Sequence, residues 1–113
     1  MTFEKLLCEA RKVHCKEMRV SNDDYFEVVV AKADLGAMGA ILQEYFGQPY
    51  KAGGVQPSPE AKRYAAVHGG IYTGQTMYFK QESGAKAFAY FWPWTGGTPI
   101  TVKIIRQEAP AQQ

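Results

Sequence analysis

The sequence predicts an α+β fold: a four- to five-stranded, mainly antiparallel sheet with two or three helices packed on one face. Two observations lead to this prediction. Apolar residues recur at helical spacing in the first half of the chain, whereas the second half consists of short apolar stretches between turns rich in Gly and Pro. With 113 residues, 46% hydrophobic and 21% charged, the chain has the size and composition of one globular domain. We expect a single domain over residues 1–107 and a flexible C-terminal tail over 108–113.

The first half is expected to hold three helices and one strand. Apolar residues at helical spacing predict a helix over about 2–17, and a turn and then a strand over 25–32 should follow it. A second helix should begin with Asp34 as its N-cap and end at Gly47. A third, short helix should begin with Ser58 as its N-cap and a proline at its first position.

The second half is expected to form a meander of three or four strands. The strands should cover residues 71–81, 86–92 and 100–106, with Gly-containing turns between them. The first of these stretches is long enough to bend or to divide into two strands. Together with the strand over 25–32, this gives the four or five strands of the predicted sheet.

The strand over 86–92 alternates small and large side chains. Because successive residues of a strand point to opposite faces, Ala87 and Ala89 share one face and the large aromatic residues share the other. The small face suits a helix that lies close to the sheet, and we expect the second helix, with glycines at positions 36 and 39, to pack there. The large face carries Phe88, Tyr90 and Trp92.

The large face is the first candidate for function. It combines aromatic with charged side chains, which is too polar for a sealed core and typical of an interface or a binding groove. We therefore interpret the protein first as an interaction module that forms a homodimer or binds another protein through this face, so that Tyr90→Asp should give a folded monomer. The alternative is that the first helix folds across the face. The predicted interface residues are Tyr25, Tyr78, Phe88, Tyr90, Trp92 and Lys103.

A second hypothesis is a small-molecule-binding protein or a modest enzyme, with a pocket near the end of the sheet. Trp92 and Trp94 precede a Gly/Pro turn that could place both indole rings at the rim of a pocket. The long loop that contains Gly53 and Gly54 could close over this pocket. His68, at the predicted end of the third helix, could contribute an imidazole.

Single-stranded nucleic-acid binding is the third hypothesis. Residues 86–93 loosely resemble the aromatic octapeptide on which RNA-recognition-motif sheets stack bases, because a basic residue is followed by aromatic residues at alternate positions. Ala87 and Pro93 depart from that pattern, and a net charge of +2 is small for a nucleic-acid partner. Residues 69–76 lie one residue from a phosphate-loop pattern, but Gln75 replaces the required lysine, so we expect no nucleotide site there.

The sequence indicates no catalytic, cofactor or metal site. Cys8, His14 and Cys15 are the candidate metal ligands, yet on one helix the two cysteines lie two turns apart and His14 points about 100° away from Cys15. The chain also contains no long apolar run and no signal-peptide pattern. We therefore expect a cytoplasmic protein with no cofactor, no metal and no membrane partner.

Overall fold

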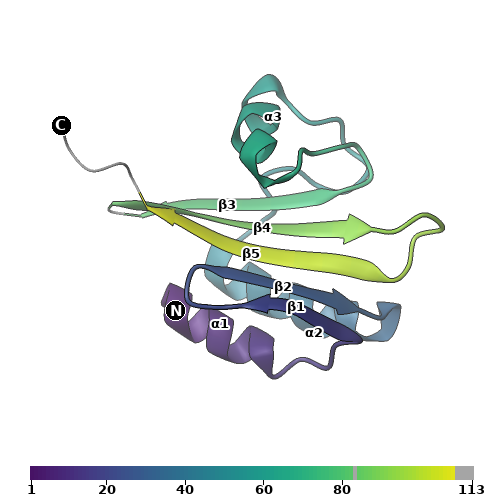
Figure 1. The fold of residues 1–113 in the computed structure, drawn as a ribbon. Helices are drawn as coiled ribbons and strands as arrows, with labels where there is room; N and C mark the ends of the chain where they lie inside the picture. The colour runs from purple at the N-terminus through teal and green to yellow at the C-terminus, as the bar shows by residue number, and fades with distance from the viewer. Residues whose placement is uncertain (83, 109–113) are drawn as a thin grey trace.

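A five-stranded antiparallel sheet lies between two helices on one face and a short helix on the other (Figure 1). The computed structural model describes residues 1–82 and 84–108. The predicted α+β fold is confirmed, and two of the three helices share one face as expected. In chain order the elements are α1 (Phe3–Arg11), β1 (Glu17–Ser21), β2 (Tyr25–Val30), α2 (Lys32–Phe46), α3 (Pro59–Ala65), the 3-10 helix η1 (Ala66–His68), β3 (Thr76–Glu82), β4 (Ala85–Pro93) and β5 (Ile100–Glu108).

The strand order is β1-β2-β5-β4-β3, so the last strand of the chain lies in the middle of the sheet. β5 pairs with β2 from Tyr25 opposite Ile105 to Val30 opposite Ile100. Its other edge pairs with β4 along the full length of both strands. Because β5 joins the β1–β2 hairpin to the β3–β4 hairpin, residues about 80 positions apart in the chain become neighbours on the sheet.

The first core lies between the sheet and the helices α1 and α2. Leu6 of α1 and Leu42 of α2 are fully buried there against side chains of β2, β4 and β5. As predicted, α2 shares this core with the small face of β4, which Ala87 and Ala89 provide. Other large side chains that are fully buried in this core are Phe26, Val28, Val30, Met38, Val102 and Ile104.

The glycines of α2 are not needed for its approach to the sheet, contrary to our interpretation of the sequence. A Cβ atom on Gly36 would meet nothing within 4 Å, and one on Gly39 would lie 4.0 Å from the Phe91 ring, an ordinary contact. The helix also begins at Lys32 without a side-chain cap, so Asp34 is not its N-cap but lies in its first turn. The predicted end at Gly47 is confirmed.

The predicted first helix is too long, and an edge strand takes its second half. α1 begins at the Thr2 cap, whose side chain accepts a hydrogen bond from Lys5 N at 3.0 Å, but the helix ends at Arg11. The following residues pair with β2, starting with a bond from Lys16 N to Val29 O at 2.7 Å. β1 has almost only exposed residues, so no apolar alternation marked it as a strand, and pairing with β2 overrides the helical spacing.

The second core lies on the opposite face, under α3 and η1. The predicted cap of α3 is confirmed, because Ser58 Oγ accepts a hydrogen bond from Ala61 N at 3.1 Å. Gly69 then ends η1 in the left-handed conformation. The buried residues of this core are Ala61, Ala65, Ile71, Met77, Phe88 and Tyr90.

Two further predictions need correction. Tyr78 pairs with Ala89 and lies in the first core, while Phe79 opposite Phe88 faces α3, so the predicted faces of β3 were exchanged. The strand is apolar at three successive positions here, and alternation alone therefore leaves its orientation open. In addition, Glu108 belongs to β5 rather than to the predicted tail, whose remaining residues, 109–113, lie outside the described part of the chain.

Candidate functional site

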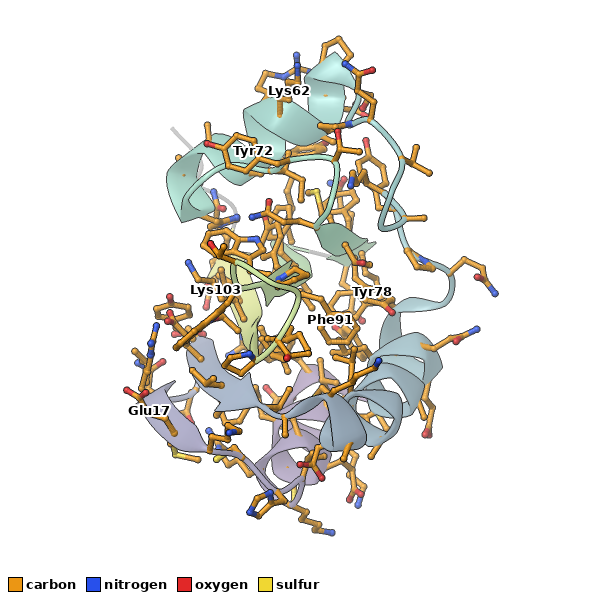
Figure 2. The ribbon with its side chains drawn as sticks, turned by 90° about the vertical axis from the view of Figure 1, so that its right-hand side faces the viewer. Glu17, Lys62, Tyr72, Tyr78, Phe91 and Lys103 are labelled. Atoms are coloured by element: carbon orange, nitrogen blue, oxygen red, sulfur yellow. The ribbon has the colours of Figure 1, made fainter. Side chains whose placement is uncertain are left out.

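The cover over the second face is incomplete, and its boundary follows β5. α3 and η1 pack on β3 and β4, where Phe88 and Tyr90 are buried. Register places Glu27 of β2, Lys103 of β5 and Tyr90 of β4 side by side on this face, but only Tyr90 lies wholly beneath the helical cover. Figure 2 shows Lys103 between α3 and β1, on the side of the molecule where Glu17 lies. The polar residues of this face therefore begin where the helical cover ends.

A hollow of about 360 Å³ opens at this boundary, between η1 and the strands β2 and β5. This volume lies within the range of about 300–1,000 Å³ that is usual for small-molecule sites. Ile105 and Val67 contribute apolar surface, and Tyr25 contributes a ring that is half-buried. The hollow is lined by Asp24, Tyr25, Val67, His68, Ile105 and Arg106.

His68 places a half-buried imidazole in the lining. Its Nδ1 lies 2.6 Å from the hydroxyl oxygen of Tyr90, which is fully buried beneath η1. Burial lowers the pKa of His68, the positive charge of Lys103 lowers it further, and the Gln107 side chain acts in the opposite direction. The imidazole is therefore neutral at neutral pH.

Lys103 and Trp92 hold the end of η1 against the sheet. The Lys103 ammonium donates a hydrogen bond to His68 O at 3.1 Å and lies 3.7 Å from the centre of a Trp92 ring. Burial lowers the pKa of Lys103, and nearby Glu27 opposes this effect. Gly69 allows the contact, because a Cβ atom there would lie 2.4 Å from the Trp92 ring and the backbone has a φ of +113°.

The charged groups at the hollow already have partners. Arg106 forms ion pairs with Glu4 at 2.9 Å and with Asp24 at 3.1 Å. Tyr25 donates a hydrogen bond to Glu27, and together with burial this raises the pKa of Tyr25 to about 12, so its phenol keeps its proton. The hollow thus offers apolar walls, neutral polar groups and charged groups that are already paired with one another.

The centre of the predicted aromatic interface is buried rather than exposed. Phe88 and Tyr90 are 1% and 0% exposed, because α3 and η1 cover them, and α1 lies on the other face. Tyr78 is excluded from this face by its register. Tyr25, Trp92 and Lys103 remain partly accessible and lie on the predicted face.

The structure brings together only part of the predicted pocket. His68 and Trp92 are neighbours through Gly69 and Lys103. Trp94 lies beyond the end of β4, where its Nε1 donates a hydrogen bond to Thr101 Oγ1 at 2.8 Å and where its ring, beside Arg19, is 42% exposed.

The loop that contains Gly53 and Gly54 does not close over the hollow. It packs against the turn before β3, where a Cβ atom on Gly53 would meet Thr76 Oγ1 at 3.0 Å and Gly54 N donates to Thr73 O at 2.7 Å. Neither glycine is among the residues that line the hollow.

Sequence reasoning missed the residues that β2–β5 pairing brings to the hollow. Asp24 and Arg106 are 82 residues apart, yet Arg106 N donates to Asp24 O at 2.8 Å. Nothing in the spacing of these residues indicates the contact, because it depends on the position of β5 within the sheet. A candidate search based on turn residues would have found Asp24 alone.

Lys51 is a buried cation that sequence reasoning missed. Its ammonium donates hydrogen bonds to the carbonyl oxygens of Tyr72, Thr73 and Gln75, at 2.9 Å and 2.5 Å for the first two. Burial lowers its pKa. These bonds shape the turn that leads into β3 and that borders a second hollow of about 350 Å³, lined also by Lys62 of α3.

Over residues 1–82 and 84–108, no group of three or more His, Cys, Asp or Glu residues is placed to hold a metal ion. The helices of the same two stretches are too short or too polar to span a bilayer. Comparisons with protein-family models, with curated proteins and with solved structures gave no match to this chain.

Proposed function

We propose that this protein binds a small, uncharged molecule in the hollow between η1 and the strands β2 and β5. The observation that supports this proposal most directly is the half-covered sheet face, where apolar walls, a neutral imidazole and a protonated phenol surround a hollow of about 360 Å³. The second hypothesis drawn from the sequence, a small-molecule site that includes His68, is retained in this form. Its lining differs from the predicted one.

Apolar contact would supply most of the binding free energy. Val67 is 75% exposed although its side chain is aliphatic, and it stands at the rim of the hollow beside Ile105. Removing apolar surface from water contributes roughly 25 cal/mol per Å², so a ligand gains about 1–2 kcal/mol by covering the apolar lining, and more from burying its own apolar surface, before ordering costs. The paired charges of Arg106 argue against an ionic ligand, because a charged group would have to displace Asp24 or Glu4.

The two other hypotheses from the sequence receive less support. An interface centred on Phe88 and Tyr90 would need η1 to move away, whereas partner binding through Tyr25, Trp92 and Lys103 would not. Base stacking on residues 86–93 meets the same obstacle, since its two central aromatic rings are covered. A native mass spectrum of the freshly purified protein separates these alternatives, because it reports retained small molecules and oligomeric state together.

The direct test is a screen of small uncharged aromatic molecules by ¹H–¹⁵N correlation spectra of the labelled protein. We expect shifted amide signals at Tyr25, Val67, His68 and Ile105, which the hollow brings together from three elements. Shifts confined to the second hollow, near Lys62, or the absence of any shift across the screen would contradict the proposal.

Two matched variants test whether the ligand binds in the proposed hollow or in the second one. Val67→Asp puts a carboxylate at the rim of the hollow and should weaken binding, whereas Tyr72→Asp changes a residue that lines the second hollow. Both side chains are exposed, at 75% and 69%, so both variants should fold. Equal affinity in the two variants would contradict the proposed site.

A further inference from the structure

We propose that Tyr90 fixes the tautomer of His68, so that His68 holds its proton on Nε2 and the ligand of the hollow is a molecule with a hydrogen-bond acceptor. This inference rests on the proposed function and specifies the chemistry of the same site. The sequence suggested Tyr90 as a contact residue of an interface. Here Tyr90 is instead a positioning residue that acts through His68.

The first step concerns the proton of the Tyr90 hydroxyl. Tyr90 is fully buried, and within the described residues its hydroxyl has His68 Nδ1 as its hydrogen-bond partner, at 2.6 Å. A neutral imidazole holds one proton, on Nδ1 or on Nε2. If it were on Nδ1, the Tyr90 oxygen would accept and its own hydrogen would be buried without an acceptor, which is unfavourable. The phenol therefore donates to Nδ1, and the imidazole proton lies on Nε2.

The second step concerns the charge of the imidazole. The groups that face His68 are Tyr90 from β4 and Lys103 and Gln107 from β5. Across the hollow stand Asp24, Tyr25 and Arg106. Burial and Lys103 favour the neutral ring, and Tyr90 as a donor favours it too, because a protonated imidazole offers no acceptor at Nδ1. The ring is thus a neutral donor rather than a cation.

The third step concerns the direction of the donor. Nδ1 and Nε2 lie on different edges of the imidazole ring, so a ring whose Nδ1 faces buried Tyr90 turns Nε2 away from the core. The exposed Gln107 side chain, two residues beyond Ile105 on the same face of β5, raises the pKa of His68, as an amide oxygen does when it accepts from the ring. A ligand acceptor in the hollow can take the place of this exposed amide.

The chemistry of the ligand follows from these steps. A site that donates one hydrogen bond between apolar walls discriminates against molecules that carry only donors or no polar group. Because Arg106 is already paired with the carboxylates of Glu4 and Asp24, an uncharged acceptor such as a carbonyl or carboxamide oxygen fits better than a third carboxylate. The expected ligand class is therefore a small uncharged molecule with a carbonyl group.

The tautomer can be tested without a ligand. The chain contains two histidines, and exposed His14 serves as an internal reference in long-range ¹H–¹⁵N spectra of the imidazole rings. We expect wild-type His68 to show a protonated Nε2 and an unprotonated Nδ1, and Tyr90→Phe, which keeps the ring but removes the hydroxyl, to mix the two tautomers. A protonated Nδ1 in the wild type, or no change in Tyr90→Phe, would overturn the inference.

The ligand class is tested with four probes of similar size: benzamide, benzoate, toluene and benzylamine. Benzamide should bind about tenfold more tightly than toluene, the ratio expected for one added hydrogen bond, and benzylamine should bind more weakly still. His68→Phe should abolish the preference for benzamide while toluene still binds, and His14→Phe should leave the preference unchanged. Binding of the probes without this preference would overturn the inference and leave the proposed function standing. Failure of all four probes to bind would contradict the proposed function itself.

Discussion

The two faces of the sheet differ in how completely they are covered. On the first face, α1 and α2 bury side chains from β2, β4 and β5 in one continuous apolar core. On the second, α3 and η1 bury only the part over β3 and β4, and the remaining surface carries polar residues such as Glu27 and Lys103. A complete cover leaves no room for a ligand, whereas an incomplete one leaves a boundary where apolar and polar groups meet.

The two faces can be compared directly along β4, because its successive side chains point alternately to one face and the other. Along β4, Ala89 faces the complete cover and Tyr90 faces the incomplete one, yet both are fully buried. On the second face the large side chains of Phe88 and Tyr90 pack beneath the short helix α3 and η1. We conclude that the second face has its own core, and that the candidate site lies at the margin of this core rather than on it.

The largest effect is expected from Tyr90→Asp. The substitution puts a carboxylate in a fully buried position on the second face, and an uncompensated buried charge costs about 3–5 kcal/mol. We expect the variant to be largely unfolded, not the folded monomer that the sequence alone suggested. Tyr90→Phe is the control and should lose about 1 kcal/mol. Urea unfolding followed by circular dichroism measures both, and a stable Tyr90→Asp variant would contradict the second core.

The next effect is expected from Gly69→Ala at the end of η1. The backbone φ of +113° and the short approach to Trp92 both disfavour a Cβ atom. A cost of roughly 2 kcal/mol in the free energy of unfolding is expected, since the left-handed conformation alone costs about 1–2 kcal/mol for a residue other than glycine. A matched substitution, Gly54→Ala, also has a positive φ but open space around it, so it should cost less. Equal costs would show that the contact with Trp92 is unimportant.

The third expected effect is a pH dependence of the free energy of unfolding, and it originates from His68 on the second face. The pKa of His68 is lower in the folded protein than its ordinary value of 6.5, so the unfolded chain binds this proton more readily. The contribution of His68 to the free energy of unfolding is therefore fully present above pH 6.5 and decreases as the pH falls below that value. Because only one proton is bound, the free energy of unfolding can change by at most about 1.4 kcal/mol per pH unit.

Unfolding measurements between about pH 7 and pH 5 test this dependence, because the carboxyl groups with lowered pKa values, such as those of Glu4 and Glu9, contribute below this range. His68→Phe should remove the dependence, while His14→Phe should retain it. The same slope in wild type and His68→Phe would assign the effect to another group.

The smallest effect has the opposite sign and concerns the first face. Gly36→Ala replaces a glycine inside α2 at a position where a Cβ atom meets nothing within 4 Å. Alanine favours the helix by about 0.5–1 kcal/mol over glycine, so the variant should be more stable by that amount in thermal unfolding. A loss of stability would mean that α2 does need glycine for its approach to the sheet.

Much of the fold could be predicted because local signals agreed with it. The cap at Ser58, the end of α2 at Gly47 and the alternation of β4 depend on neighbouring residues alone. β1 could not be predicted, because a polar edge strand has no apolar alternation and its pairing with β2 is a tertiary effect. The orientation of β3 failed for the opposite reason, since three successive apolar residues fit either face.

The candidate site was less predictable than the fold. His68 could be proposed from its place at the end of a helix, and Trp92 from its position near the end of an aromatic strand. Asp24, Ile105 and Arg106 reach the same hollow only because β5 inserts beside β2, which no local pattern specifies. The burial of Tyr90 likewise depends on which helix covers which face.

Lys51, whose ammonium shapes the turn before β3, also forms an isolated antiparallel bridge with Met77 of that strand. β3 is an edge strand, and an unpaired edge can template the addition of another chain. Lys51 occupies the start of this edge with two backbone bonds to Met77, of 3.0 and 2.9 Å, while its ammonium is held by the neighbouring turn. A second chain cannot add a strand at Met77 without removing a buried cation from its carbonyl partners. The lysine that shapes the turn therefore also protects the edge.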